Sequence, residues 1–156
     1  MHAPEPWSAE RAAEVIARFT DGQGSLLPLL HALQEVFGCI PGQAIRPLAE
    51  ALNLSRAEVH GVVSFYHDFR RAPPGRHVLK LCQAEACQSM GCRGLAAEMQ
   101  QRLGIRLGET TPDGRVTLEA VYCLGLCATA PSAMLDGQVL GRLTAARAAA
   151  LVEKLA

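Results

Sequence analysis

Six cysteines occur among the 156 residues of this chain, and four of them form two close pairs. Cys82 and Cys87 have four residues between them, and Cys123 and Cys127 have three, so the complete spacing is C-x4-C-x35-C-x3-C. Each pair directly follows a stretch whose side chains alternate like those of a β-strand. If these two strands are parallel or adjacent, their ends bring the pairs together. We therefore expect the four thiols to act as one metal site.

The spacing within the pairs bears on which metal these thiols would bind. Structural zinc sites built from two cysteine pairs usually have two residues between partners, and neither pair here is C-x2-C. The wider loops fit two thiolates on one iron of a [2Fe-2S] cluster, and plant-type ferredoxins also contain a C-x4-C element. No histidine lies in either loop, which argues against a Rieske centre, and the missing C-x2-C argues against thiol–disulfide exchange. The spacing favours a [2Fe-2S] cluster and leaves zinc as the alternative.

The other two cysteines and two nearby glycines have separate predicted roles. Cys92 follows Cys87 by five residues, but it falls inside a helical pattern, so we expect its side chain to point away from the loop. Cys39 is expected to be a buried small residue, since a free cysteine behaves as a hydrophobe. Gly91 and Gly125 are either turn residues or positions that let backbone N–H groups approach the sulfur atoms, where such hydrogen bonds tune a cluster's potential.

Composition and charge narrow the class of protein. Apolar residues make up 49% of the chain and charged residues 19%, which is typical of a globular protein. Fifteen basic residues balance fifteen acidic ones, so we expect no binding to nucleic acid. The sequence shows no secretory leader and no apolar run of the roughly 18–20 residues that span a bilayer, so we expect no membrane insertion. These features predict a cytoplasmic protein, and because disulfides are rare in the cytoplasm they favour metal binding by the cysteines.

The first 70 residues have the apolar periodicity of helices. Ser8 and Ser25 are placed to cap two of them, and Ser55 with Glu58 forms the signature of a capping box. The expected helices cover residues 9–20, 26–37, 43–52 and 56–69. Pro47 predicts a bend or a late start in the third helix. The fourth is expected to bury one stripe of side chains, namely Val59, Val62, Val63, Tyr66 and Phe69.

The segment 70–76, with two adjacent prolines and a glycine, cannot continue a helix and predicts a domain boundary. The expected elements after it are strands over 77–81 and 116–121, a helix over 89–103, a hairpin of 132–135 with 138–140, and a final helix capped by Thr144. This β-α-β-β-α order is thioredoxin-like. We therefore predict an α+β chain with an N-terminal helical bundle over 1–75 and a thioredoxin-like α/β [2Fe-2S] ferredoxin domain over 76–156.

Several stretches of the chain resemble a known family. CQAEAC and CLGLCATAPSAMLDG are similar to the thioredoxin-like [2Fe-2S] subunit of NADH dehydrogenases, the 24 kDa type of respiratory complex I. LLPLLHALQEVFGCIPGQAIRPLAEALNLSRAEVHGVVSFYHDFR resembles the N-terminal bundle of that family, so the resemblance covers nearly the whole chain. Within the family, LNLSRAEVHGVVSFYHDFR and CQAEACQSMG are most similar to the gamma subunit of soluble, molybdenum-containing, NAD-dependent formate dehydrogenase. Close relatives occur in NAD-reducing hydrogenases.

This resemblance implies a function and a set of partners. It places the cluster ligands at Cys82, Cys87, Cys123 and Cys127, and none at Cys92. It implies a larger partner subunit that carries flavin (FMN), the NAD(H) site and a [4Fe-4S] cluster, and a third subunit that oxidises formate at a molybdenum cofactor. The chain itself would be a non-catalytic electron-transfer subunit. It contains no G-x-G-x-x-G and no P-loop motif, which agrees with a nucleotide site on the partner.

Other functions remain as alternatives. The parent complex could instead be an NAD-reducing hydrogenase or complex I. Residues 48–66 also resemble a helix-turn-helix, which would suit a redox-sensing regulator, but after Arg56 and Glu58 the second helix offers mainly apolar side chains and the chain lacks a basic surface. A free-standing ferredoxin would not need residues 1–75, whose expected role is docking to the flavin subunit.

Overall fold

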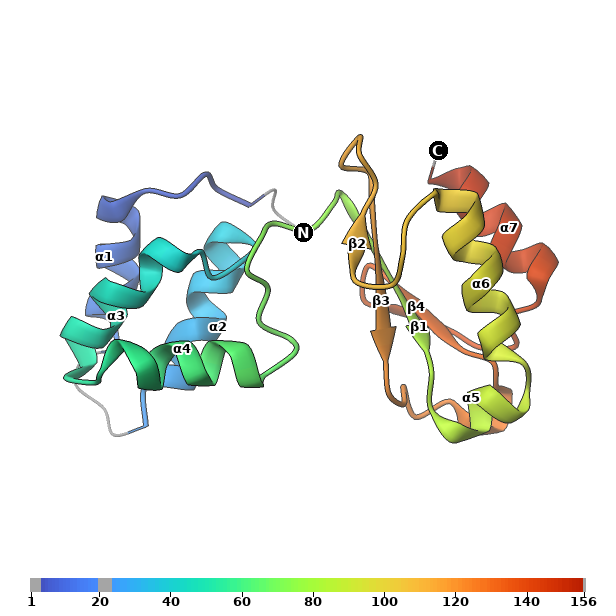
Figure 1. The fold of residues 1–156 in the computed structure, drawn as a ribbon, viewed down its shortest axis with the longest axis horizontal. Coiled ribbons are helices and arrows are strands. Elements are labelled where there is room, and N and C mark those ends of the chain that lie inside the picture. The colour runs from blue at the N-terminus through green and yellow to red at the C-terminus, as the bar shows by residue number, and fades with distance from the viewer. Residues whose placement is uncertain (1–3, 20–23, 156) are drawn as a thin grey trace. The chain divides into compact units, whose positions relative to one another are not determined.

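The chain forms two compact units, Met1–Pro73 and Pro74–Ala156, which divide between two adjacent prolines. The computed structural model describes residues 4–19 and 24–155 (Figure 1). It confirms the predicted α+β architecture, because helices make up the first unit and a sheet covered by helices makes up the second.

The described residues of the first unit form a bundle of four α-helices. Its elements are α1 (Ala9–Ala17), α2 (Leu26–Phe37), a 3-10 turn η1 (Gly42–Ala44), α3 (Ile45–Leu52) and α4 (Arg56–Phe65). The largest of the fully buried side chains in its core are Val15, Leu29, Leu30, Leu33, Phe37, Ile40, Leu48 and Val59. The ring of Trp7 packs on this core, with its centroid 4.9 Å from that of Phe37. The predicted late start of the third helix is confirmed, since Pro47 is only the third residue of α3 and η1 precedes it.

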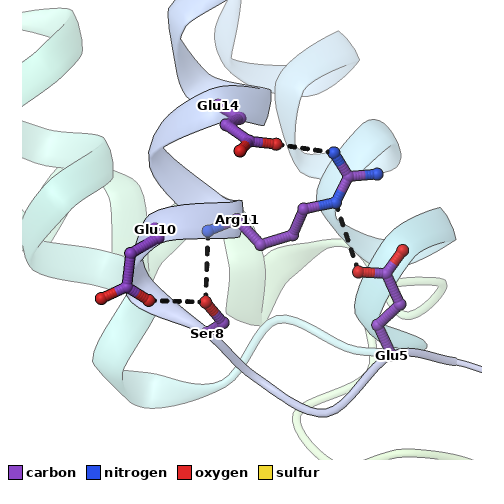
Figure 2. A network of polar contacts seen from close by, with 5 residues as sticks. All are labelled: Glu5, Ser8, Glu10, Arg11 and Glu14. Atoms are coloured by element: carbon purple, nitrogen blue, oxygen red, sulfur yellow. Dashed lines mark hydrogen bonds and ion pairs between the residues drawn. The ribbon is translucent and has the colours of Figure 1, made fainter.

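Helix α1 begins with the predicted cap at Ser8. The Ser8 hydroxyl accepts a hydrogen bond of 3.3 Å from the backbone N–H of Arg11 and donates one of 2.7 Å to Glu10 (Figure 2). The Arg11 guanidinium then bridges Glu14, at 2.8 Å, and Glu5, at 3.2 Å. These contacts fix the first turn of the helix to the segment that precedes it.

The predicted end of the first helix and the predicted cap of the second can each be compared with the structure. Helix α1 ends at Ala17, and its predicted end at Thr20 lies outside the described residues, as does the turn at 21–23. The predicted side-chain cap at Ser25 is wrong: Ser25 precedes α2, but its side chain makes no capping hydrogen bond. The reason is its backbone, which is already helical at φ −67°, whereas a capping residue normally has extended dihedrals that aim its oxygen at the first turn.

Helix α4 has the predicted capping box. The backbone N–H of Glu58 donates to the Ser55 hydroxyl at 3.2 Å, and the N–H of Ser55 donates to the Glu58 carboxylate at 2.8 Å. The predicted length of this helix is wrong, because the chain leaves it after Phe65 with Tyr66 extended. Tyr66 is 44% exposed and is therefore not part of the buried stripe. Phe69 is buried as predicted, but from the segment after the helix.

The second unit is built on one five-stranded sheet. The strands are β1 (His77–Cys82), β2 (Glu109–Thr110), β3 (Val116–Val121), β4 (Ala133–Leu135) and β5 (Gln138–Leu140), in the spatial order β2-β3-β1-β4-β5. Strands β1 and β3 pair in parallel at the centre, and every other pairing is antiparallel. The predicted hairpin around Asp136-Gly137 is confirmed as β4–β5.

Three α-helices accompany this sheet: α5 (Glu85–Ser89), α6 (Cys92–Leu103) and α7 (Ala145–Lys154). Helices α6 and α7 lie side by side along the sheet (Figure 1). The Thr144 hydroxyl caps α7 as predicted, by accepting from the N–H of Arg147 at 3.3 Å. Leu79, Met99, Leu118 and Ala133 are among the fully buried residues between sheet and helices.

The helix predicted over 89–103 starts only at Cys92, as α6, because the chain breaks at Met90 and Gly91, and Ser89 is the last residue of a separate short helix, α5. This break changes which way Cys92 points, as described below. Strand β2 was not predicted, since its two residues are too short for an alternating pattern. None of the helices within residues 4–19 and 24–155 has the length and apolar character needed to span a bilayer.

Candidate metal centre

The two central strands bring both cysteine pairs to one edge of the sheet. In the parallel register of β1 and β3, Cys82 is the partner of Val121. The backbone N–H of Gln83 also donates to the carbonyl oxygen of Val121, at 2.8 Å. Cys123 follows two residues later, so the loop after β1 and the loop after β3 start side by side. The prediction that adjacent strand ends bring the two loops together is confirmed.

The first loop holds its two cysteines in the protein interior. Cys82 ends β1, and Cys87 lies on α5; both side chains are buried. Ser132 contacts both cysteines: its carbonyl oxygen accepts from the N–H of Cys82 at 3.0 Å, and its hydroxyl lies 3.5 Å from the Cys87 sulfur. Ser132 is itself buried, so this hydroxyl is a polar group built into the site next to a thiol.

The second loop presents its cysteines at the surface. Cys123 has the left-handed backbone conformation, at φ 84°, which is uncommon for residues other than glycine and tends to cluster at functional sites. Cys127 begins the 3-10 turn η2 (Cys127–Thr129). The two sulfur atoms lie 3.8 Å apart, and the N–H of Gly125 points at the Cys123 sulfur from 3.4 Å. Of the two roles left open for Gly125, the structure shows the approach of its N–H to a sulfur atom.

The thiols influence one another's ionisation. Burial raises the pKa of Cys82, but hydrogen bonds from the N–H of Ala84, from Cys87, from the N–H of Cys123 and from Ser132 outweigh it, and the net pKa is lowered. The pKa of Cys127 is raised, chiefly through its contact with the Cys123 sulfur, with smaller contributions from burial and from charge on Cys87 and Cys82. Cys82 and Cys87 of one loop thus act electrostatically on Cys127 of the other.

The expectation that Cys92 points away from the loop is wrong. Cys92 is the first residue of α6, is only 3% exposed, and packs with Cys82 and Cys87 in one buried cluster. Its sulfur lies 3.8 Å from the side-chain oxygen of Gln83. Burial raises the pKa of the Cys92 thiol, and charge on Cys87 and then on Cys82 adds to the effect.

Two further predictions about single residues are now decided. The N–H of Gly91 donates to the carbonyl oxygen of Gln88 at 3.0 Å, so Gly91 is a turn residue and not a donor to sulfur. Cys39 is buried in the first unit, as predicted, and its burial raises the pKa of its thiol.

The chemistry of the donor set fits an iron–sulfur cluster. The 3.8 Å between the Cys123 and Cys127 sulfurs matches two ligands on one tetrahedral ion with metal–sulfur bonds of about 2.3 Å. Within the part of the chain that the structure describes, no three His, Cys, Asp or Glu side chains converge closely enough to hold one metal ion. All four proposed donors are cysteine thiols, the ligand set of ferredoxin-type [2Fe-2S] clusters.

Comparison with known proteins identifies the family. The family described as thioredoxin-like [2Fe-2S] ferredoxin matches residues 12–156. The chain belongs to this family, and its cofactor is accordingly a [2Fe-2S] cluster. The predicted family and cofactor are both confirmed, and zinc is set aside. The chain is an electron carrier of the ferredoxin type.

Two relatives cover most of the chain. It is 38% identical over 144 residues to a subunit of NADH-quinone oxidoreductase from Rhizobium meliloti (strain 1021), an alignment that spans 92% of this chain and 86% of that protein. It is 33% identical over 141 residues to NADP-reducing hydrogenase subunit HndA of Solidesulfovibrio fructosivorans, with coverage of 90% and 82%.

A solved structure has the same fold. It is a chain of NAD+-reducing [NiFe]-hydrogenase in the air-oxidized state, which superimposes with a TM-score of 0.70 at 32% sequence identity over 83% of this chain. The present chain spans only 22% of the length of that hydrogenase chain. The fold therefore also occurs as one part of a much longer polypeptide.

Proposed function

We propose that this chain is the [2Fe-2S] electron-transfer subunit of an NAD-linked oxidoreductase complex, with Cys82, Cys87, Cys123 and Cys127 as the ligands. The observation that carries the proposal is the juxtaposition of the two cysteine pairs, which follow the parallel strands β1 and β3 at the same edge of the sheet. All four donors are thiols, as [2Fe-2S] ferredoxins require.

The residues of the site have distinct tasks in electron transfer. When bound, the cluster supplies a centre that accepts and releases one electron at a time. Cys82 and Cys87 hold it from the protein interior, where water is excluded. The Gly125 N–H and the Ser132 hydroxyl point at ligand sulfurs and stabilise the negative charge that collects there.

The exposed loop defines the side on which electrons enter and leave. Cys123 and Cys127 are at the surface, and two large side chains beside the cysteine loops are also exposed, Tyr122 at 77% and Met90 at 61%. A partner that covers these side chains would bring its own redox centre next to the exposed cysteines. We assign this surface to contact with the electron donor or acceptor.

The names of the relatives support a partner of a particular kind. Both are subunits of oxidoreductases that act on nicotinamide nucleotides, one named an NADH-quinone oxidoreductase and the other an NADP-reducing hydrogenase. We infer a partner subunit with FMN, the NAD(H) site and a [4Fe-4S] cluster, to which residues 1–75 dock. For the parent complex we propose NAD-dependent formate dehydrogenase, with a larger molybdenum-containing subunit that converts formate to CO2. This choice is supported by the resemblance of residues 52–70 and 82–91, and the hydrogenase and complex I are the alternatives.

Two experiments test this function. The purified chain should contain iron and acid-labile sulfide, and after reduction with dithionite it should give the EPR signal of one [2Fe-2S]⁺ centre that persists at relatively high temperature. A colourless, zinc-containing protein would overturn the proposal. An affinity-tagged chain expressed in its native host should co-purify with a flavoprotein, and NAD⁺ reduction by the isolated complex with formate, with hydrogen or with neither then identifies the parent enzyme.

A further inference from the structure

A fifth cysteine lies beside the ligand set and has no assigned role. Cys92, Cys82 and Cys87 form one buried cluster, in which Cys92 is the only member outside the predicted ligands. A buried cysteine ordinarily serves as a small apolar side chain. Here the two cysteines that pack with it are both proposed iron ligands, so a third thiol lies beside the two of the first loop.

The backbone of this segment explains why Cys92 faces the site. Helix α5, which carries Cys87, has only five residues and ends at Ser89. Gly91 then adopts a left-handed conformation, at φ 86°, and α6 starts directly with Cys92. This turn changes the direction of the chain between the two helices, and the Cys92 sulfur lies 3.8 Å from the side-chain oxygen of Gln83, the residue after β1. A continuous helix would have pointed it elsewhere.

Cys87 and Cys82 differ in how firmly they are held. Cys82 is the last residue of the central strand β1, where hydrogen bonds to β3 and to Ser132 fix the backbone around it. Cys87 lies instead on the short helix α5, directly before the turn at Gly91. If a ligand of the first loop is lost, the segment that can adjust is the one between Cys87 and Cys92.

We propose that Cys92 is a reserve ligand, which binds the iron in place of Cys87 when the Cys87 thiolate is absent or blocked. In this exchange the Cys92 thiol gives its proton to solvent, and its sulfur forms an iron–sulfur bond at the position that Cys87 no longer holds. No electron is transferred, and the total charge of the cluster with its four thiolates is unchanged. The proposal rests on Cys87 being a ligand, as the proposed function requires.

The test compares iron content, sulfide content and the EPR spectrum of the full chain and its cysteine variants. In Cys87→Ala the cluster should be retained, with shifted g-values because the new ligand approaches from α6. In Cys87→Ala/Cys92→Ala it should be lost, since losing a ligand costs at least the roughly 10–100-fold in metal affinity that losing a second-shell partner costs. Cys87→Ala/Cys39→Ala is the matched control, and it should keep the cluster because Cys39 lies in the other unit.

The possible outcomes separate this inference from the proposed function. Equal loss of the cluster in Cys87→Ala and in Cys87→Ala/Cys92→Ala would overturn the reserve-ligand role and leave the four-ligand site intact. Equal retention in both would overturn the role and also Cys87 as a ligand. Loss of the cluster in the single variant Cys92→Ala, which keeps all four proposed ligands, would show that the proposed ligand set is wrong. Far-UV circular dichroism of each variant must match that of the unmodified chain, so that loss of the cluster is not loss of the fold.

Discussion

The backbone N–H of Gln83 donates a 2.8 Å hydrogen bond to the carbonyl oxygen of Val121, and this bond joins the two loops that carry the cysteines. Gln83 is the residue after Cys82, and Val121 is the last residue of β3. The bond continues the parallel pairing of β1 and β3 by one step beyond the strands. The positions of the two cysteine pairs are therefore set by the backbone of the sheet, and side chains around them only adjust the chemistry.

Gly125→Ala should lower the reduction potential of the cluster. Its N–H lies 3.4 Å from the Cys123 sulfur, and its φ of 75° costs an L-residue about 1–2 kcal/mol. Relief of that strain moves the N–H away from the sulfur, so the extra negative charge of the reduced cluster is stabilised less. EPR-monitored redox titration measures the shift.

The matched control for that substitution is Gly137→Ala in the β4–β5 hairpin. Gly137 has a similar φ of 86°, and like Gly125 it has room for a Cβ. It should therefore lower the melting temperature by a similar amount but leave the reduction potential unchanged. Equal reduction potentials in the unmodified chain, Gly125→Ala and Gly137→Ala would contradict a role for the Gly125 N–H in setting the potential.

Ser132→Ala should also lower the potential, by removing the hydroxyl 3.5 Å from the Cys87 sulfur. A hydrogen bond contributes a net of about 0.5–1.5 kcal/mol, so its loss should lower the potential of a one-electron couple by at most about 65 mV. Ser89→Ala is the control, because the Ser89 hydroxyl donates to the carbonyl oxygen of Ala86 instead. The prediction fails if both variants have the potential of the unmodified chain.

The cysteine pairs could be placed from the sequence because the signals involved are local. Alternation of side chains defines β1 and β3, and each pair follows its strand within a few residues. The orientation of Cys92 could not be predicted, because it depends on a break in the helix at Met90 and Gly91. A helical periodicity that starts at Ser89 continues through that break, and it therefore predicts the wrong orientation for the Cys92 side chain.

The fourth helix shows a second limit of periodicity. Apolar residues continue at helical spacing beyond Phe65, but the chain has already become extended at Tyr66. Phe69 is nevertheless buried, so the pattern predicted its burial correctly and assigned it to the wrong element. Spacing records which residues are apolar, whereas the end of a helix depends on tertiary contacts.

Leu33→Ala should destabilise the helical unit and spare the cluster. Leu33 is fully buried in α2, and such a truncation costs about 2–5 kcal/mol. The two hydrophobic cores share no residue. The midpoint temperature of unfolding, measured by far-UV circular dichroism, should therefore fall for the helical unit. The temperature at which the cluster loses its visible absorbance should stay unchanged. Leu27→Ala, at a more exposed position of the same helix, should change stability by only about 0.5 kcal/mol. If the visible absorbance of Leu33→Ala is lost at an equally lowered temperature, the two units unfold together.

Thr111→Val should raise the pKa of Asp113. The Thr111 hydroxyl donates to this carboxylate at 2.6 Å and is the main reason that its pKa is lowered from 3.8 to about 2; the N–H and the guanidinium of Arg115 add to the effect. Because the folded state favours the ionised carboxylate, its contribution to stability is complete above about pH 4 and is lost as the pH falls toward 2. Carbon-13 NMR titration of the Asp113 carboxyl should give a pKa closer to 3.8 in Thr111→Val, with a smaller loss of stability over that pH range. Thr111→Ser keeps the hydroxyl and should keep the low pKa, so a raised value in the serine variant, or an unchanged one in the valine variant, would contradict this assignment.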